Sequence, residues 1–369
     1  MTLVSHVCKN TGVLHFVPAL DRRNTYGGPS SVAQDIVGEQ RRRNTESMIF
    51  GAFRRGQRME LTSIPCRFFW GFQLGRSRKP GMIFSPGAIA WWLIHARGKV
   101  THFHAAREPI ALALMALAVI LHRPYVIQLH GMLEGSTTGR LESRWLRYLL
   151  GKARHVWGLT ETEVQIGTTV FRLRSISRLP NAIDLELQQK LKIPPAPVDV
   201  LFCARLHPRK GLVTFLRAAQ WLQTIDPRAS FTVVGPDEGD GWRIGAARAE
   251  GLQNIEYTGG VTVTESRHLI SSASVLVVTA MHEPFGMTVL EALAQGTPVV
   301  AVAGGLLLEP ELLAAGALTV TSDSPEALAT AVGRMRSPFA ADDQIRQGLQ
   351  WCAKNASLKI VVDRIEACL

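Results

Sequence analysis

The chain has 369 residues, of which 46% are hydrophobic and 19% are charged; this is an ordinary globular composition, and the length allows two domains with a core each. Its five cysteines (Cys8, Cys66, Cys203, Cys352 and Cys368) form no C-x-x-C pair, which argues against a disulfide framework or a zinc site and fits a reducing cytosol. Residues 1–187 hold 25 Lys/Arg and 12 Asp/Glu (+13), whereas residues 188–369 hold 16 and 18 (−2), and together they make the net charge of +11.

The basic charge of the first half bears on partners and on the membrane. Such a charge attracts polyanions: nucleic acid, an anionic membrane face or phosphorylated substrates. A soluble basic surface with no particular partner is the alternative. We expect no secretory signal, because residues 1–12 lack a basic start followed by an apolar run. The longest apolar run, 110–121, is too short for a bilayer span of about 20 residues, so we expect a buried helix there.

Short strand-like runs alternate with helical patterns along the first half. The runs with a strand pattern are 13–17, 100–104, 125–129 and 155–159, and helical patterns lie between them at 30–43 and 108–122. This alternation predicts parallel α/β layers.

Residues 53–81 combine seven cations with the aromatic residues Phe68, Phe69, Trp70 and Phe72. A basic and aromatic composition is typical of an interfacial membrane contact. A core-facing aromatic cluster with a charged exterior is the alternative. We expect peripheral binding to an anionic membrane, and an acceptor that is lipid-linked or otherwise anionic.

The second half repeats the α/β alternation after a proline-rich stretch. Three prolines in four positions at 194–197 cannot continue a helix or a central strand, so 190–200 is the predicted linker. Strand patterns then lie at 198–204, 230–235, 275–279 and 298–303, and helical patterns include 211–223 and 324–336. Two doubly wound halves predict a cleft between them, because open α/β sheets bind ligands at the carboxyl ends of their strands.

Two cationic residues follow the strand that is predicted at 198–204. Arg205 and Lys210 precede Gly211, which opens a helix. Positive charge beside the free amides of a helix N-terminus suits a diphosphate. A solvated turn with incidental charge is the alternative.

The stretch HEPFGMTVLEALAQG places two carboxylates around a helix start. The helix is expected from Met287 to Gln295, ending at Gly296. Glu291 lies one turn inside the helix and can hold the vicinal hydroxyls of a ribose, while Glu283 on the loop can hold a sugar ring. Helix-start amides can face a sugar hydroxyl or a phosphate, and they belong to Phe285, Gly286, Met287 and Thr288. Acidic residues that merely complement the helix dipole are the alternative, which explains one glutamate and not both.

The motif E-P-F-G-x-x-x-x-E at 283–291 is very similar to the E-x7-E signature of retaining glycosyltransferases of family 4, the group 1 family. R-L-x-x-x-K-G at 205–211 resembles the pyrophosphate-binding motif of that family, and the order and separation of the two motifs also match. Further agreement spans nearly the full chain: Y-G-G at 26–28, Q-L-H-G at 128–131, L-P-N-A-I-D at 179–184, and A-L-T-V with S-P-E-A-L-A at 317–329.

The resemblance implies the GT-B fold, an α/β architecture in which two Rossmann-like doubly wound domains face each other across a cleft. Residues 1–189 would form the acceptor-binding domain and 196–351 the nucleotide-sugar-binding domain. Residues 352–369 would form a C-terminal helix that packs back toward the N-terminal domain.

The resemblance also implies a role for each matching residue. Glu283 would contact the donor sugar, Glu291 would hold the nucleotide ribose, and Arg205 and Lys210 would neutralise the departing diphosphate. His130 would lie near the reacting carbon, with a hydrogen-bonded histidine at a strand end as the alternative. The glycine loop after the first strand would approach the phosphates or the acceptor, through Tyr26, Gly27 and Gly28; a plain turn before a helix is the alternative.

Two positions depart from the family pattern. Asn181-Ala182 stands where the family usually has Asn-Gly, so the turn there is expected to differ if it needs a positive φ. Gly304-Gly305 is followed by Glu309 at a longer spacing than the usual Gly-Gly-x-x-Glu, so the choice of donor cannot be copied over.

The implied activity is hexosyl transfer of the EC 2.4 type: a sugar moves from a nucleotide diphosphate-sugar to an acceptor hydroxyl with retention, in polysaccharide or glycolipid assembly. No cofactor is expected. No D-x-D lies at a strand end, and PDEGD at 236–240 has the composition of a turn, so Arg205 and Lys210 would replace a metal. We expect a cytoplasmic protein, bound peripherally to the inner face of the membrane.

Three other readings stay open. A GT-B enzyme of different chemistry, a phosphorylase or a nucleotide-sugar epimerase, shares the fold, although no pyridoxal lysine can be placed. A nucleic-acid-binding protein would also be basic, but only Arg41–Arg43 form a cationic run, so we expect no nucleic-acid partner. A dinucleotide dehydrogenase would need G-x-G-x-x-G after the first strand, and that motif is absent.

Overall fold

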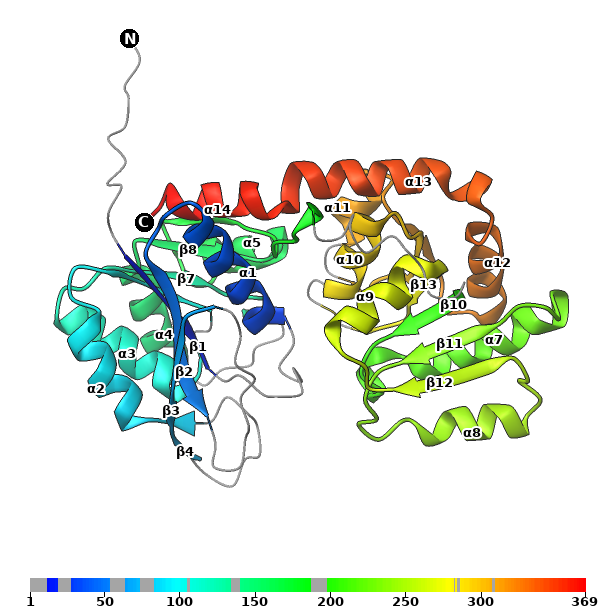
Figure 1. Ribbon diagram of the computed structural model, residues 1–369, viewed down its shortest axis with the longest axis horizontal. Coiled ribbons are helices and arrows are strands. Elements are labelled where there is room, and N and C mark those ends of the chain that lie inside the picture. Colours follow the sequence, from blue (N-terminus) through cyan, green and yellow to red (C-terminus); the bar gives the residue numbers. More distant parts are fainter. Residues whose placement is uncertain are drawn as a thin grey trace, which may run out of the picture. The chain divides into compact units, whose positions relative to one another are not determined.

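The computed structural model describes residues 12–18, 28–53, 64–73, 83–104, 107–133, 140–186, 198–281, 283, 286–306 and 309–369. The chain folds into two compact units (Figure 1). Unit 1 comprises Met1–Ala182 and Leu358–Leu369, and unit 2 comprises Ile183–Ser357. The division falls at Ala182, before the proline-rich stretch, of which 190–197 lies outside the described residues. The helix η2 (Cys352–Ala356) belongs to unit 2, and only the last helix, α14 (Leu358–Glu366), belongs to unit 1.

Unit 1 is built on a parallel sheet in the order β3-β2-β1-β6-β7-β8-β9. Its strands are β1 (Val13–Val17), β2 (Ser47–Phe53), β3 (Cys66–Trp70), β6 (Val100–Phe103), β7 (Tyr125–Gln128), β8 (His155–Gly158) and β9 (Ile176–Arg178). A short antiparallel pair, β4 (Phe72–Gln73) with β5 (Ile83–Phe84), stands apart from it. The central strands are buried on both faces, which is why their sequences are nearly continuous hydrophobic runs.

Helices cover both faces of this sheet. One face packs its main core against α2 (Pro86–His95), α3 (Pro109–Ile120), α4 (Arg140–Lys152) and α5 (Glu161–Thr169). The other face is covered by α1 (Gly28–Arg42), and α14 lies alongside α1. The apolar run at 110–121 is therefore the core helix α3, as predicted. Within the described part of the chain, no helix is long and apolar enough to span a bilayer.

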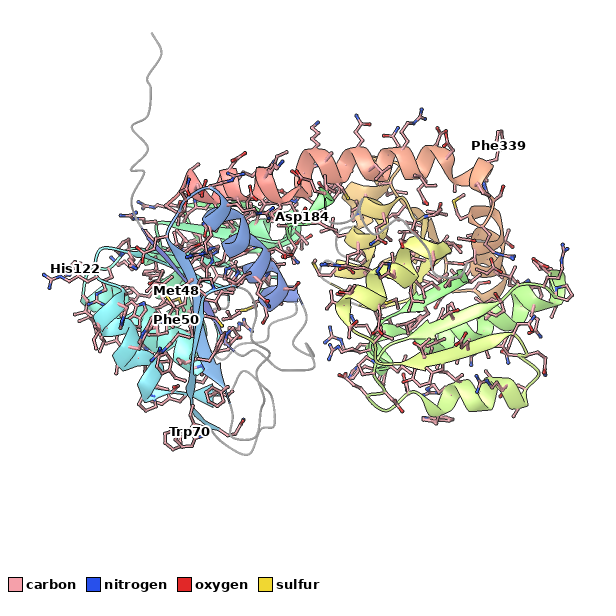
Figure 2. All side chains as sticks on the ribbon, in the orientation of Figure 1. Met48, Phe50, Trp70, His122, Asp184 and Phe339 are labelled. Atoms are coloured by element: carbon pink, nitrogen blue, oxygen red, sulfur yellow. The ribbon has the colours of Figure 1, made fainter. Side chains whose placement is uncertain are left out.

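The aromatic stretch in 53–81 divides between core and surface. Phe68 and Phe69 pack against the two cores of unit 1, whereas Trp70 and Phe72 are 44% and 50% exposed. Trp70 projects from the end of β3 (Figure 2). The core-facing alternative therefore describes Phe68 and Phe69, whereas the membrane contact through Trp70 and Phe72 stays a prediction.

Unit 2 is built on a second parallel sheet, in the order β12-β11-β10-β13-β14-β15. Its strands are β10 (Val198–Cys203), β11 (Phe231–Val234), β12 (Ile255–Gly259), β13 (Ala273–Val278), β14 (Val299–Val302) and β15 (Thr319–Thr321). Its helices are η1 (Pro208–Lys210), α7 (Leu212–Ile225), α8 (Trp242–Ala249), α9 (Val263–Ser272), α10 (Met287–Gln295), α11 (Glu309–Ala314), α12 (Pro325–Met335) and α13 (Pro338–Trp351). The core joins α7, α8 and α12 to the sheet.

Both sheets have the doubly wound strand order. Counted along the chain, unit 2 reads 3-2-1-4-5-6, and unit 1 has the same order with a seventh strand added. The order reverses between β1 and β6 in unit 1 and between β10 and β13 in unit 2. Ligands of such sheets bind outside the carboxyl ends of the strands at these switch points, so each unit has its own candidate site in the residues that follow these strands.

Candidate functional site

The switch point of unit 2 holds two of the sequence motifs side by side. The 205–211 motif follows β10, and Glu283 follows β13. The loops are tied together, because Thr279 Oγ1 donates to the carbonyl oxygens of Lys210 (3.1 Å) and Gly211 (2.8 Å). Gly211 has φ +71°, and a Cβ there would stand 2.0 Å from the Thr279 oxygen, so only glycine fits.

Lys210 and Glu283 form an ion pair at this point. Lys210 Nζ donates to Glu283 Oε2, and both side chains are about one-fifth exposed, at 20% and 21%. The Glu283 backbone N–H donates to the Gly305 carbonyl at 2.7 Å, which fixes the residue between two loops. The structure therefore brings together an ammonium group and a carboxylate that are 73 residues apart in the chain.

Arg205 has a different partner from Lys210. Its Nη1 donates to both carboxylate oxygens of Glu238 at 3.1 Å, and its side chain is 48% exposed. Glu238 lies in the stretch 236–240, which is a turn as predicted: Asp237 Oδ1 accepts from the N–H groups of Gly239 and Gly241. Joint action of Arg205 and Lys210 on a diphosphate stays a prediction.

The helix after Glu283 forms as the sequence predicts. It runs from Met287, with Thr288 next, to Gln295, and it ends at Gly296 in the left-handed conformation. Gly286 caps its start with φ +71° and offers no side-chain cap. Phe285, the other predicted contributor of an amide, lies outside the described residues.

Glu291 lies buried in α10 and pairs with a residue that sequence reasoning missed. Arg267 Nε, from α9, donates to Glu291 Oε1 at 2.9 Å, and the two side chains are 12% and 9% exposed. Burial raises the pKa of Glu291, and Arg267 opposes that shift. No sequence signal marked Arg267, since it lies in the predominantly polar segment VTESRHLISS.

The switch point of unit 1 lies between β1 and β6, and β7 is the next strand of the sheet. Gly28 opens α1 after β1, while Tyr26 and Gly27 lie outside the described residues. After β6, the Arg107 Nε and Nη2 atoms are buried and have no hydrogen-bond partner among the described residues. Beside it, burial raises the pKa of Glu108 to about 7.

His130 follows β7 and is held on both ring nitrogens. Its Nδ1 lies 3.1 Å from Asn181 Oδ1, and its Nε2 lies 3.2 Å from His104 Nδ1. Burial lowers the pKa of His130 to about 4, so the ring is neutral at pH 7. The hydrogen-bonded histidine that was the alternative from sequence is therefore present; a role near the reacting carbon stays a prediction. Ala182, beside Asn181, is not among the described non-glycine residues with positive φ, so the Asn-Ala sequence causes no such strain.

Glu163 fixes the loop that carries His130, and sequence reasoning missed it. This fully buried carboxylate accepts from the N–H groups of Gly131 and Leu133 at 3.0 Å and of Leu159 at 2.7 Å. Burial raises its pKa, and these backbone donors oppose the shift. The loops after β7 and β8 are thereby joined through one side chain.

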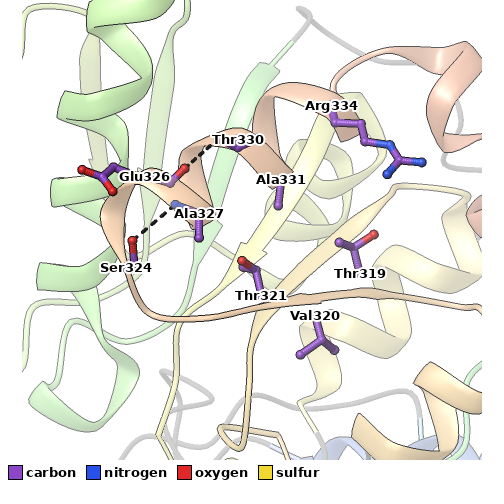
Figure 3. Close-up of a pocket in the computed structure, with 9 residues that line it drawn as sticks. All are labelled: Thr319, Val320, Thr321, Ser324, Glu326, Ala327, Thr330, Ala331 and Arg334. Atoms are coloured by element: carbon purple, nitrogen blue, oxygen red, sulfur yellow. Dashed lines mark hydrogen bonds between the residues drawn. The ribbon is translucent and has the colours of Figure 1, made fainter.

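A hollow of about 560 Å³ lies elsewhere in unit 2, between β15 and α12 (Figure 3). Its lining is mostly short polar and apolar side chains, and its two charged residues, Glu326 and Arg334, stand at opposite ends of it. None of the predicted site residues lines it, and it holds no convergent set of polar groups of the kind that a ligand site needs.

Solved structures of other proteins share this architecture. Anabaena HepE, solved in complex with UDP-glucose, is 18% identical with a TM-score of 0.71, and the match covers 97% of this chain and 99% of that chain. The sucrose-phosphate synthase of Thermosynechococcus elongatus is 18% identical with a TM-score of 0.70, covering 97% and 98%. At this level of identity the likeness shows the fold alone. The fold is GT-B, the class of the sugar-transferring proteins with two doubly wound domains.

Family comparisons narrow this class. Residues 184–337 match the family described as glycosyl transferases group 1, and residues 26–187 match the one described as Glycosyltransferase Family 4. The two matches overlap at 184–187 and together span 26–337. The chain belongs to the group 1, family 4 glycosyltransferases.

Curated relatives agree with this family over parts of their length. A D-inositol 3-phosphate glycosyltransferase of Streptomyces griseus is 34% identical over 155 residues, which is 39% of this chain and 33% of the relative. A glycogen synthase of Mycobacterium tuberculosis is 28% identical over 214 residues, 53% of this chain and 50% of the relative. The chain thus matches a third to a half of the length of these relatives.

Proposed function

We propose that this protein moves a sugar from a nucleotide diphosphate-sugar to an acceptor hydroxyl with retention at the anomeric carbon. The observation that carries the proposal is the Lys210–Glu283 pair, held where β10 and β13 end at the switch point of unit 2. A ligand with anionic and hydroxyl groups can satisfy both residues at once, and a sugar diphosphate has both kinds of group.

The donor replaces the internal ion pair. Lys210 moves from Glu283 to a diphosphate oxygen, Glu283 accepts hydrogen bonds from sugar hydroxyls, and the helix start at Gly286, Met287 and Thr288 faces the phosphates. Arg205 turns from Glu238 to the diphosphate, and Glu291 accepts from the ribose hydroxyls.

The reaction follows a front-face route. The bond from the anomeric carbon to the diphosphate oxygen breaks, and the bond to the acceptor oxygen forms on the same face. The leaving phosphate takes the proton of the acceptor hydroxyl. Charge grows on the diphosphate as this happens, so the cations stabilise the transition state more than the ground state. They do so in place of a metal ion, and no cofactor takes part.

The donor and the chemistry are tested together. UDP-, GDP- and ADP-sugars are screened against the purified chain, with UDP-glucose first because HepE was solved with it. Products are then identified, since transfer yields a new glycoside, whereas an epimerase yields an altered nucleotide-sugar and a phosphorylase a sugar phosphate.

Replacement of Glu283 tests the carboxylate at the centre of the site. Glu283→Gln keeps the shape but removes the charge, and we expect nucleotide affinity within a few-fold of the unaltered protein and a loss of turnover of at least about 10²-fold. Calorimetric titration with the nucleotide and initial rates of transfer check the two halves separately. The matched control is Glu256→Gln on β12, an exposed carboxylate outside the site; unchanged turnover in Glu283→Gln would remove this residue from the mechanism.

The acceptor is proposed to be lipid-linked or otherwise anionic and to reach the protein through unit 1 at a membrane face, in polysaccharide or glycolipid assembly. Support comes from the +13 charge of residues 1–187 and from the exposed aromatic rings. Besides Trp70 and Phe72, Trp145 and Tyr148 on α4 are 57% and 49% exposed. Exposed aromatic rings among basic residues are typical of membrane-interface contacts.

A further inference from the structure

A cluster of histidines lies inside unit 1, on the face of the sheet that α1 covers. His15 on β1 stands opposite His102 on β6 in the strand register, and His104 follows two residues later on the same face. All three are at most 1% exposed, and their ring centroids are 4.2 to 5.3 Å apart. The opposite face of the same strands carries Leu14, Phe16 and Phe103 in the apolar core.

Two of these histidines belong to a continuous row of hydrogen-bonding groups. His15 Nε2 lies 2.8 Å from Gln40 Oε1, and His15 Nδ1 lies 3.0 Å from His104 Nε2. The row continues from His104 Nδ1 to His130 Nε2, and from His130 Nδ1 to Asn181 Oδ1, at 3.2 and 3.1 Å. Carbonyl oxygens, which only accept, stand at both ends.

When every ring is neutral, this row of hydrogen-bonding groups lacks one proton. Since Asn181 Oδ1 only accepts, His130 Nδ1 and then His104 Nδ1 must carry the protons, which leaves a lone pair on His104 Nε2. Since Gln40 Oε1 only accepts, His15 Nε2 must carry the proton, which leaves a lone pair on His15 Nδ1. These two lone pairs face each other at 3.0 Å. Burial lowers the pKa of His15 to about 4 and that of His104 well below its usual value, so protonation is costly at pH 7.

His102 adds a third unused ligand. Neither ring nitrogen of His102 has a hydrogen-bond partner within the described ranges, although the residue is fully buried. A buried polar group left unpaired is unfavourable, so a bound group that uses the ring is favoured. Gln128, on the same face of the neighbouring strand β7, is also buried, and its amide has no partner in the described part of the chain.

We propose that His15 Nδ1, His104 Nε2 and one ring nitrogen of His102 bind a divalent transition-metal ion, for which Zn²⁺ is the best match. One ligand atom from each residue can be chosen so that all three lie within 4.8 Å of one another. A tetrahedral site with Zn–N bonds of 2.0–2.1 Å needs separations of about 3.3 Å, so the 3.0 Å pair fits and rotation of the His102 ring closes the remainder.

The surroundings suit a metal-binding histidine set. Neutral imidazole is the form that binds Zn²⁺. The second nitrogen of His15 is oriented by Gln40 and that of His104 by His130, as is usual for the outer partners of metal-ligating histidines. Water or the Gln128 amide oxygen can take the fourth position. The scattered cysteines argue against a zinc site built on cysteine; this set contains no cysteine.

The ion has a structural role in the switch point of unit 1. It joins β1 to β6 and fixes the ring of His104, which contacts His130. Since no reacting group is among the ligands, the inference is independent of the proposed sugar transfer.

Metal content of the full chain tests the inference. The protein is purified without a histidine tag, dialysed against metal-free buffer with and without prior Zn²⁺ loading, and analysed by plasma mass spectrometry. We expect about one Zn²⁺ per chain, a drop below one-tenth of that in His102→Gln, and no change in His95→Gln, an exposed histidine on α2. Co²⁺ loading should give the visible bands of a tetrahedral site in the unaltered chain and in His95→Gln, but not in His102→Gln.

A second measurement, on the unaltered chain, keeps the inference testable even if His102→Gln fails to fold. Equimolar Zn²⁺ should raise the Tm of the unaltered chain, and chelator should reverse the rise. The inference is overturned if the unaltered chain retains no metal and its Tm does not move. The inference is also overturned if nitrogen-15 spectra show all of these histidines neutral and the Gln40 amide rotated so that its N–H donates to His15 Nε2. Every contact in the row then has one donor and one acceptor, and no proton is missing.

Discussion

Lys210 and Glu283 show at the level of single residues how a site can be ready for a charged ligand. Each is partly buried, and each would be costly to leave unpaired, so the pair lowers the cost of holding both in place. Under the proposed function, a nucleotide-sugar must break this pair, and it can do so only by offering each residue a partner at least as good. Selectivity for a ligand with both phosphates and hydroxyls follows from that requirement.

The Arg267–Glu291 pair allows a prediction about stability. Arg267→Met leaves a buried carboxylate without its partner, and we expect the free energy of unfolding to fall by about 3 kcal/mol. The double variant Arg267→Met/Glu291→Met replaces the whole pair with apolar groups and should recover most of that loss. Urea unfolding of the unaltered chain, both single variants and the double variant checks this; a double variant no more stable than Arg267→Met would contradict it.

Glu108 predicts a pH dependence. Its pKa rises from 4.5 to about 7 on folding, so the folded chain binds this proton more tightly than the unfolded chain. The stabilisation is therefore complete below pH 4.5 and is lost as the pH rises toward 7, with a slope of up to about 1.4 kcal/mol per pH unit.

The variant Glu108→Gln should remove that slope. Because other groups titrate in the same range, the quantity to measure is the difference in unfolding free energy between the two proteins at several pH values from 4.5 to 7. The difference should shift in favour of Glu108→Gln as the pH rises. A constant difference would show that Glu108 has its ordinary pKa when the chain is folded.

At the level of elements, the strands that the sequence predicted are largely buried central strands, although β2, which is also largely buried, was missed. The β1, β6, β7, β8, β10, β11, β13 and β14 strands were all predicted within two residues of their ends, because a parallel central strand is a continuous apolar run. The missed strands are mostly at or near the sheet edges, and several are short or mixed in pattern, such as ISR in β9 and TVT in β15. Their pairing depends on the neighbouring strand more than on their own residues.

The candidate site was predictable to the same extent. Arg205, Lys210 and Glu283 follow strand ends, so their position at one sheet edge follows from the strand order. Two ion-pair partners did not follow from sequence: Glu238, which pairs with Arg205, and Arg267, which pairs with Glu291, come from other elements, and only the folded chain brings them close. The histidine row likewise requires the β1–β6 register, which places His15 opposite His102.

The connection between η1 and α7 gives a prediction for a whole element. Gly211→Ala puts a Cβ 2.0 Å from a backbone oxygen at φ +71°, and we expect a loss of about 2–5 kcal/mol in unfolding free energy. Gly245→Ala, inside α8 with open space around it, is the matched control and should be neutral or stabilising by up to about 1 kcal/mol. Chemical denaturation of both variants checks the pair, and equal effects would rule out the close approach.

At the level of the whole molecule, the chain passes between the units twice, after Ala182 and after Ser357. The last helix, α14, completes unit 1. Arg43, which directly follows α1, donates to the Lys359 carbonyl at 3.1 Å and to the Glu366 carboxylate at 3.3 Å. Val361, Val362 and Ile365 are fully buried. Unit 1 therefore gains its last core residues only when the final segment of the chain is in place.

The uneven charge leads to a prediction about membranes. The +13 of residues 1–187 should draw the full chain to vesicles that contain anionic lipid, and binding should weaken as salt rises from about 0.01 M to about 1 M, because the Debye length falls from about 30 to about 3 Å. Neutral vesicles should bind weakly at every salt concentration. Co-sedimentation measures the bound fraction.

Exposed rings should supply the part of this binding that salt does not remove. The double variant Trp70→Ser/Phe72→Ser removes two rings that are 44% and 50% exposed. At the same salt concentration, we expect a smaller fraction of this variant than of the unaltered chain to be bound to the vesicles. Phe339→Ser is the matched control, since Phe339 is 95% exposed and lies in unit 2 (Figure 2). If the unaltered chain stays in the supernatant at low salt, the proposed membrane binding is wrong and the acceptor must be sought in solution. If both variants lose binding equally, the rings of unit 1 have no special part in membrane binding.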